Sequence, residues 1–430
     1  MAEQLGVLRT FLGDKKLYDA VSQCSRCGYC EQACPTYLES GREDRSPRGR
    51  NQLVRMMLEG KLADAASAEE ALSTCLLCGA CSSVCPAKVP TADIVLEGRR
   101  ALRADESGAA RRLGALLERP ALLSFLLRWA YRLQRWGLAT LAARLGLGRL
   151  PGLGPLVDAG AHLDEAPRRL LREDLAADGD LREEGAAWVY YPACGPSYVL
   201  PRVGLATVRA LKRLLGRGSW LDAPCCGLAA YNYGDVAQAR AFARKNIERL
   251  EASPAKGPLI GDCSSCVAHL KTYPQLFLGE PEWLARAERF SARVQDAVEA
   301  LPRALGERAC AAPGPVNTLH DACRARNGQG IWKEPRAAMG KMCGNSYKEL
   351  PEADQCCGGA GAFAFVHGDI SEELLKRKVA NIASVGARVV AASSTSCLLQ
   401  LARGLKKYYP ECKAVHLSEL ISEGLERADG

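Results

Sequence analysis

The sequence lacks a long, uninterrupted apolar run. Its richest stretch, residues 122–147, is broken by four arginines, so no membrane-spanning helix is expected. These are Arg128, Arg132, Arg135 and Arg144. The first nineteen residues mix acidic and basic side chains and contain no apolar core of signal-peptide length, which predicts a cytoplasmic chain.

Motifs for nucleotide and phosphate binding are missing too. No G-x-G-x-x-G sequence follows a strand pattern, and there is neither a P-loop nor an H-E-x-x-H sequence. We therefore expect this chain to bind no flavin or nucleotide of its own. No catalytic residue can be named from these patterns.

Lysine is absent from residues 99–172, which contain fourteen arginines against six acidic residues. This segment alone therefore carries the formal excess of +8 charges. Five apolar residues share one helical face within it: Leu122, Leu126, Trp129, Leu133 and Trp136. Such a helix either packs this face on the protein core or offers a basic amphipathic surface to anionic lipid or an acidic partner. Because no nucleic-acid-binding motif accompanies the charge, we expect no nucleic-acid partner.

Cysteine is absent between Cys85 and Cys194, although the chain contains 20 cysteines. Eight lie before residue 90 and twelve lie from residue 194 onward. A secreted disulfide scaffold is short and rich in cysteine throughout. Clustered cysteines in a long chain without a signal peptide point instead to bound metal.

Two complete cysteine runs occupy the N-terminal part. Residues 24–35 and 75–86 both read C-x2-C-x2-C-x3-C-P, the run that holds two four-iron clusters in bacterial ferredoxins. In this pattern the fourth cysteine of each run serves the other cluster. The cluster-1 set is therefore predicted as Cys24, Cys27, Cys30 and Cys85. The cluster-2 set is predicted as Cys75, Cys78, Cys81 and Cys34.

Forty residues separate Cys34 from Cys75, and this insert contains two helical patterns, LVRMMLEG and AEEALSTC. This length favours a helical two-cluster ferredoxin module over the smaller hairpin type. Such a module carries electrons and has no substrate pocket.

A different cysteine pattern begins near residue 188. A short strand pattern, residues 188–191, precedes Cys194, and the adjacent pair Cys225–Cys226 follows, then Cys263 and Cys266. The same order of strands and cysteines recurs later in the chain, where strand patterns at 316–320 and 388–392 precede Cys323 and Cys397. The first-repeat set is Cys194, Cys225, Cys226, Cys263 and Cys266. The second-repeat set is Cys323, Cys356, Cys357 and Cys397.

The two copies differ at one ligand position. Thirty-six residues lie between Cys226 and Cys263, and thirty-six lie between Cys357 and Ser394, so Ser394 stands where a cysteine is missing. Five thiolates exceed what one zinc ion or one cubane takes, which suggests an open, non-cubane iron–sulfur cluster in the first copy. Three options remain for the second copy: a four-thiolate cluster, a metal site completed by serine oxygen, or no metal. Gly227 and Gly358, which follow the cysteine pairs, are predicted to let the backbone approach the cofactor closely.

The double ferredoxin run, the sequence SPRGR at 46–50 and the two cysteine-rich repeats with CCG resemble the glycolate oxidase iron–sulfur subunit. That wider family includes one subunit of anaerobic glycerol-3-phosphate dehydrogenase and the catalytic subunit of heterodisulfide reductase. The resemblance implies two [4Fe-4S] cubanes, a cluster in the CCG repeat and a flavin-bearing partner that oxidises a 2-hydroxy acid. Electrons would pass on to a quinone or another acceptor. Because Ser394 departs from a full cysteine set, electron relay is favoured over disulfide cleavage.

The fold expected is a multidomain α+β chain with four parts. These are a helical two-cluster ferredoxin (1–98), an Arg-rich helical connecting segment (99–185) and two α/β repeats (186–305 and 306–430). The function expected is electron transfer within a glycolate- or D-lactate-type dehydrogenase complex, with peripheral contact to the cytoplasmic membrane face. The alternatives are a heterodisulfide-reductase-like catalytic subunit and a binding module whose repeats hold structural zinc.

A few cysteines and histidines fall outside the ligand sets. Cys310, Cys343 and Cys412 belong to neither repeat pattern and are expected to pack in the core. His269 and His320 lie beside the repeat cysteines, where each is either a structural histidine or a hydrogen-bond donor to a cluster.

Overall fold

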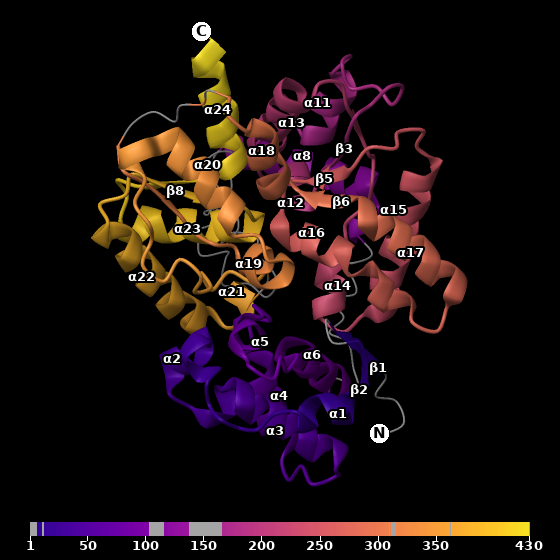
Figure 1. Ribbon diagram of the computed structural model, residues 1–430, viewed down its shortest axis with the longest axis vertical. Helices are drawn as coiled ribbons and strands as arrows, with labels where there is room; N and C mark the ends of the chain where they lie inside the picture. The colour runs from indigo at the N-terminus through magenta and orange to yellow at the C-terminus, as the bar shows by residue number, and fades with distance from the viewer. Residues whose placement is uncertain are drawn as a thin grey trace.

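The computed structural model describes residues 7–10, 13–102, 116–136, 166–308, 310, 315–361 and 363–429. Figure 1 shows three bodies. The N-terminal module, in indigo, lies at the bottom, the first repeat lies above it on the right and the second repeat lies above it on the left. This is the mixed helical and parallel-sheet fold that the sequence predicts.

The N-terminal module is helical apart from one short antiparallel hairpin. Its elements are β1 (Val7–Thr10), β2 (Gly13–Lys16), α1 (Leu17–Ser22), η2 (Glu31–Ala33), α2 (Pro35–Ser40), η3 (Glu43–Arg45), α3 (Pro47–Leu58), α4 (Ala65–Ser73), α5 (Ala80–Val84) and α6 (Thr91–Leu102). The two helical patterns of the insert are thus confirmed as α3 and α4. Helices α1, α3, α4 and α6 enclose one apolar core around Leu72 and Ile94.

The two ferredoxin runs share one backbone conformation. The second residue after the first cysteine has a positive φ in each run, +59° at Arg26 and +52° at Leu77. The glycine after the second cysteine does so as well, +80° at Gly28 and +75° at Gly79. These left-handed residues turn the chain tightly, so that consecutive cysteines can face one centre.

Only part of the connecting segment is described, as α8 (Pro120–Arg135) and α11 (Leu171–Ala177). Helix α8 buries Leu123 and Tyr131, and the Tyr131 hydroxyl donates a hydrogen bond to the carbonyl of Tyr198 (2.8 Å). The five-residue apolar face predicted from the sequence is 41–65% exposed. The described residues therefore leave this face largely exposed, and among them packing on the core, one of the two alternatives given above, finds no support.

The first repeat is a four-stranded parallel sheet flanked by helices, with strand order β4-β3-β5-β6. Its elements are β3 (Val189–Tyr191), α12 (Cys194–Tyr198), α13 (Pro201–Leu215), β4 (Ser219–Trp220), α14 (Leu228–Asn232), α15 (Val236–Ala252), β5 (Leu259–Gly261), α16 (Ser264–Lys271), η5 (Tyr273–Phe277), α17 (Pro281–Arg293), β6 (Val294–Asp296) and α18 (Ala297–Leu305).

The second repeat has a three-stranded parallel sheet of order β7-β8-β9. Its elements are β7 (Asn317–Leu319), α19 (Cys323–Gln329), α20 (Lys333–Cys343), η6 (Gly344–Ser346), α21 (Phe363–Val366), α22 (Gly368–Ser384), β8 (Val389–Ala392), α23 (Thr395–Tyr408), β9 (Lys413–His416) and α24 (Leu417–Asp429). The predicted strands of both repeats are confirmed.

The two sheets correspond in register. Tyr190 lies opposite Ile260 in the first repeat, and Leu319 lies opposite Ala391 in the second. Parallel strands end at the same edge of a sheet, so the cysteines that follow β3 and β5 meet at one edge, as do those that follow β7 and β8.

One apolar core extends through both repeats, with α13 packed on α24, so the repeats are not separate folding units. The domain boundaries given above stay a prediction.

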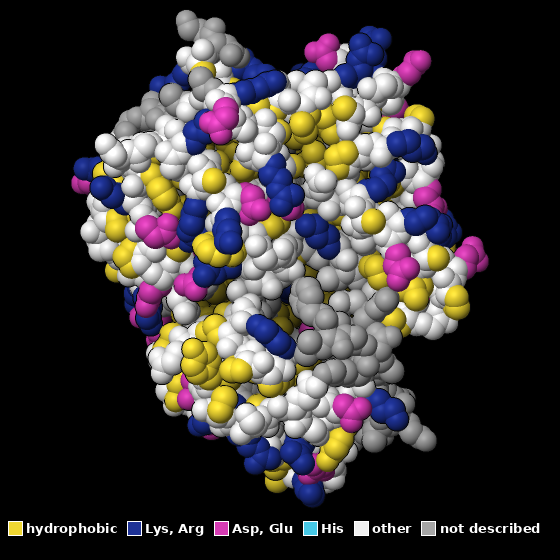
Figure 2. Space-filling view, in the orientation of Figure 1, with side chains coloured by type: hydrophobic (Ala, Val, Ile, Leu, Met, Phe, Trp, Pro, Cys, Tyr) yellow, Lys and Arg dark blue, Asp and Glu magenta, His cyan; other side chains and the backbone are white. Residues whose placement is uncertain are grey.

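The surface carries charges of both signs. On the face in Figure 2, basic and acidic side chains are interspersed with apolar patches, and no continuous basic field is visible. None of the described helices combines the length and the apolar character needed to cross a bilayer.

Candidate metal centres

The N-terminal module brings cysteines of one run to those of the other. Burial raises the pKa of Cys30 to about 11, and the neighbouring thiols of Cys24 and Cys85 add to this rise. Cys85 therefore lies with the first run although it belongs to the second, as the crossed assignment requires. The fourth member of the cluster-1 set, Cys27, lies on the surface.

All four members of the cluster-2 set line one cavity. Burial raises the pKa of Cys81, with smaller contributions from the thiols of Cys75 and Cys34. Thiols crowded together away from water resist ionisation unless a positive charge lies between them. The donor set and its enclosure thus fit a thiolate-bound iron–sulfur cluster.

Arg50 is a candidate functional residue that cysteine spacing does not single out, although it ends the SPRGR sequence. It is 1% exposed, and its Nη1 lies 3.8 Å from Cys34 Sγ. The rest of the guanidinium is bonded to Thr36, Thr74 and the carbonyl of Ala71, each at 3.0 Å. This fixed cation beside a thiolate would lower the cost of reducing a cluster bound there.

The other parts of SPRGR place that arginine. Ser46 caps α3 by accepting a hydrogen bond from the amide of Gly49 (2.9 Å). Pro47 occupies the first turn, where its missing N–H is not needed. A Cβ at Gly49 would lie 2.0 Å from the carbonyl oxygen of Glu43, so only glycine fits there. The motif therefore starts the helix whose first turns carry Arg50 to Cys34.

The first-repeat set gathers into one group. Cys194 contacts Cys225 and Cys266, and Cys226 contacts the same two thiols. Cys263 contacts Cys266. Hydrogen bonding from Cys266 lowers the pKa of Cys263 to about 6, and the Thr395 amide and Ser394 hydroxyl contribute. Five sulfur donors from three loops thus form one connected group, and five donors are more than a tetrahedral ion accepts.

The glycines that follow the two cysteine pairs allow a left-handed turn of the backbone and close packing against a neighbouring helix. Gly227 has φ +88°, and a Cβ there would meet Phe242 and Ala239 of α15 at 3.3–3.4 Å. Gly358 has φ +82°, and its Cβ would meet the carbonyl of Ser371 in α22 at 2.9 Å. These contacts account for glycine at both positions, and a direct role beside a cofactor stays a prediction.

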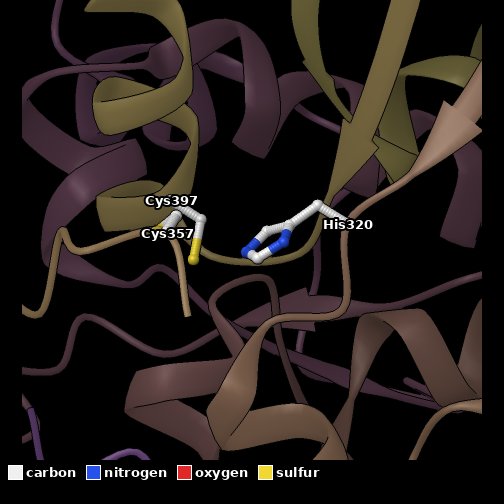
Figure 3. A group of neighbouring side chains, drawn as sticks. All are labelled: His320, Cys357 and Cys397. Carbon is white, nitrogen blue, oxygen red and sulfur yellow. The ribbon is translucent and has the colours of Figure 1, made fainter. Parts of the chain in front are cut away.

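The second-repeat set forms the same arrangement with four cysteines. Cys356 contacts Cys323 and Cys357, and Cys357 in turn contacts Cys397. His320 joins this group: a ring nitrogen and the sulfurs of Cys357 and Cys397 all lie within 4.8 Å of one another. Figure 3 shows its ring directed toward the two cysteines. Burial lowers the pKa of His320 well below its usual value, so the ring is neutral.

Ser394 does not complete this second group. Its hydroxyl is 2.9 Å from Ser265 Oγ and 3.6 Å from Cys263 Sγ, both in the first repeat, and 3.2 Å from Ser396 Oγ. The option of a second site completed by serine oxygen therefore finds no geometric support here.

The N-terminal module contacts the second repeat beside that repeat's cysteines. Cys78 of the cluster-2 set faces the thiols of Cys323 and Cys356 closely enough to interact electrostatically. Asn327 in α19 fixes this contact, because it donates to the carbonyl of Cys78 (3.1 Å) and pairs with Ser83 (3.1 Å). No sequence pattern indicates which repeat the module touches.

Three buried cysteines and one buried histidine, His269, lie outside the ligand groups described above. Cys310, Cys343 and Cys412 are buried in the shared core, as expected. His269, three residues after Cys266, lies between the rings of Tyr231 and Tyr273 at 5.1 and 5.5 Å. Burial lowers the pKa of His269 to about 3.

Comparison with known proteins agrees with this division of the chain. Residues 20–89 match the 4Fe-4S dicluster domain family, and residues 188–271 and 317–402 each match the cysteine-rich domain family. A probable glycolate oxidase iron–sulfur subunit from Bacillus subtilis is 28% identical over 424 residues, 93% of each chain. The chain belongs to the glycolate oxidase iron–sulfur subunit family.

Shorter relatives match about half of this chain. Lactate utilization protein A from an Exiguobacterium species is 30% identical over 240 residues, which are 55% of this chain and 98% of the relative. The protein of the same name from Bacillus subtilis is 30% identical over 225 residues, 51% of this chain and 92% of the relative. This family member thus combines cysteine-rich repeats with a dicluster domain, and iron–sulfur clusters are its cofactors.

Proposed function

We propose that this chain is the electron-transfer subunit of a complex that oxidises a 2-hydroxy acid, working between a flavin-bearing partner subunit and a quinone or another acceptor. When bound, two [4Fe-4S] cubanes and the clusters of the cysteine-rich repeats would supply one-electron carriers. The residues that would hold them are the cluster-1, cluster-2 and first-repeat sets, together with the second-repeat set.

One observation carries this proposal: the four thiol groups follow one another through the molecule, and each has a thiol near enough to one of the next group to interact with it electrostatically. Cys81 of the cluster-2 set interacts with Cys30 of the cluster-1 set, and Cys78 interacts with Cys323 of the second repeat. Cys397 in turn interacts with Cys263 of the first repeat. Electron tunnelling falls steeply with distance, so ligand groups that adjoin one another in series are what a relay needs.

The relatives' names support the substrate class. Glycolate and lactate are both 2-hydroxy acids, and their oxidation releases two electrons at once. A flavin accepts such a pair and can release single electrons to clusters. Since the sequence contains no motif for binding a flavin, we assign the flavin and the substrate pocket to a partner subunit.

The heterodisulfide-reductase alternative is less well supported. Cleavage of a disulfide at the repeats would be expected to use a full cysteine set in each copy, and Ser394 takes the place of one ligand while bonding to the opposite repeat. The electron-relay proposal requires no substrate at either site.

The test is electron flow from the N-terminal module into the repeats. Anaerobic, fully loaded chain is reduced with photoreduced deazaflavin and mixed with a soluble quinone, and quinone reduction is followed by stopped flow. We expect the parent chain to transfer electrons rapidly, and Cys78→Ser to leave them in the N-terminal module. Cys412→Ser, a buried cysteine outside every ligand set, is the control. A loaded parent chain that accepts no electrons would refute the relay.

A further inference from the structure

His320 occupies a special place in the comparison of the two repeats. It directly follows β7, and the register of the two sheets puts it at the position of Tyr191 in the first repeat. The Tyr191 hydroxyl lies near enough to the thiols of Cys226 and Cys266 to interact with them electrostatically, and it donates its hydrogen bond to the carbonyl of Pro224 (2.8 Å). In the second repeat, the imidazole of His320 takes the place of the Tyr191 phenol. It faces Cys357 and Cys397, which correspond to Cys226 and Cys266 of the first repeat.

The imidazole has no adequate protein partner. His320 is 1% exposed, and both ring nitrogens are buried without a hydrogen bond to the described residues. The carbonyl of Ala353 lies near the ring but already accepts the amide of Asp321 (3.1 Å). Even a weak N–H contact to that carbonyl would leave the second nitrogen's lone pair free. Buried polar atoms without partners are rare and costly, which indicates that this nitrogen binds a further group.

The ligand count leads to the same conclusion. The first repeat places five sulfur donors around its centre, whereas the second places four. Ser394 cannot restore the fifth donor while its hydroxyl bonds to Ser265 and Ser396. A nitrogen of His320 lies within 4.8 Å of both Cys357 and Cys397, which is the spacing of neighbouring ligands around one metal centre.

We propose that His320 is a ligand of an iron–sulfur cluster in the second repeat, where it completes the four thiolates of the second-repeat set. This inference rests on the proposed function, since it assigns the ligands of one site in the relay. Five donors, two of them from adjacent cysteines, exceed the tetrahedral set of a zinc ion. A redox-inert ion beside Cys78 would also interrupt the series of thiol groups.

An imidazole ligand changes the properties of the cluster. A neutral nitrogen donor in place of an anionic thiolate makes a cluster easier to reduce, as histidine does in Rieske centres. The second-repeat site should therefore have a higher reduction potential than the variant His320→Cys, in which all five donors are sulfur.

The test measures the ligand directly. Full-length chain is loaded anaerobically with iron and sulfide, and its iron, zinc and sulfide contents are measured. Reduced samples with natural and with 15N-labelled histidine are compared by pulsed electron–nuclear resonance, and potentials are measured by spectroscopic titration. The variants are His320→Tyr, which copies the first repeat, and His320→Cys. His269→Gln is the matched control, because that histidine is also buried and lies three residues after Cys266 of the first-repeat set.

We expect about sixteen irons in the parent chain and a histidine nitrogen coupling that changes with 15N. His320→Tyr should lose the coupling, whereas His269→Gln should keep it. His320→Cys should keep the iron, lose the coupling and lower one midpoint potential. Bound zinc in place of the fourth cluster, or sixteen irons without a histidine coupling, would overturn the inference. Sixteen irons without a histidine coupling would leave the relay itself intact, whereas bound zinc in the second repeat would also break the series of thiol groups on which the relay is proposed. A loaded chain that keeps the histidine coupling but transfers no electrons refutes the relay alone.

Discussion

Ser394 Oγ lies 3.6 Å from Cys263 Sγ, so the serine that replaces a cysteine in the second repeat touches the cysteine to which it corresponds. Two further hydrogen bonds between the same two loops support this contact. Ser264 donates its amide to the carbonyl of Ser393 (2.9 Å), and the two hydroxyls of these serines pair at 2.9 Å. The two repeats therefore meet at equivalent loops, and a pair of cysteines at this position would bring the two clusters' ligands together.

This contact makes Cys263→Ser an informative variant. We expect it to lose about four of the irons, those of the first repeat, because serine oxygen is a harder and more basic donor than thiolate. The second repeat and the N-terminal module should keep theirs. Iron analysis together with paramagnetic resonance checks this outcome. Unchanged occupancy and an unchanged spectrum would show that Cys263 is not a ligand.

The crossed arrangement of the ferredoxin runs predicts the effect of Cys34→Ser. This change should perturb the cluster held with Cys75, Cys78 and Cys81, whose side chains share one cavity with Cys34. It should spare the cluster held by Cys24 and Cys30. Resonance spectra of the reduced variant, compared with those of Cys27→Ser, distinguish the two clusters. Damage confined to the nearest run would contradict crossed ligation.

Arg50 should control the potential of the cluster-2 site. Loss of a charge-assisted hydrogen bond costs about 1.5–3 kcal/mol, which corresponds to a shift on the order of 60–130 mV for a one-electron couple. We expect Arg50→Gln to lower that midpoint potential by such an amount, since the guanidinium stabilises the more negative, reduced state. Arg55→Gln on the same helix is the control, because Arg55 pairs with Glu59 at the surface. Equal potentials in the two variants would argue against the role of Arg50.

Asn327 should set the speed of transfer between the N-terminal module and the second repeat. Asn327→Ala removes two hydrogen bonds across that contact, each worth about 1 kcal/mol. We expect slower electron transfer from the reduced module to quinone, with the iron content unchanged. Stopped-flow measurements with Asn381→Ala as the control check this, because Asn381 bonds only within the second repeat among the described residues. Iron loss in Asn327→Ala would instead indicate a role in holding the cluster.

The exposed face of α8 should bind anionic membranes. Its described arginines already have partners, since Arg128 pairs with Glu173 and Arg135 donates to the carbonyl of Pro167. The apolar residues therefore matter more, and Trp129→Ser combined with Trp136→Ser should weaken binding to vesicles containing phosphatidylserine at least tenfold. Trp332→Ser removes an exposed tryptophan elsewhere and is the control. Binding that is equal in both, or absent in the parent, would exclude this surface.

The sequence was most informative where spacing determines chemistry. Two complete ferredoxin runs and the matching 36-residue gaps were enough to predict the helical module, the strands before the repeat cysteines and the position of Ser394. Those features are local, because each depends on residues close together in the chain or on an internal repeat.

The contacts between distant parts of the chain could not be predicted in this way. Cys78 and Cys323 are neighbours through contacts between distant parts of the chain, such as the hydrogen bond between Asn327 and Cys78, which are 249 residues apart. The sequence left His320 either as a structural histidine or as a hydrogen-bond donor to a cluster, since its relation to Tyr191 emerges only from strand register. The apolar face of α8 was correctly grouped, but periodicity cannot say whether a face meets protein or solvent.

The position of Cys78 also bears on how the protein is assembled. Its thiol lies at the junction with the second repeat, where Leu76, Cys356 and Phe363 pack into a small apolar group. Cys78 thus takes part in two structures at once, because its thiol belongs to the cluster-2 set while its carbonyl accepts the hydrogen bond from Asn327. A change in the loop that carries Cys78 would therefore alter both the cluster-2 site and the junction between the two domains.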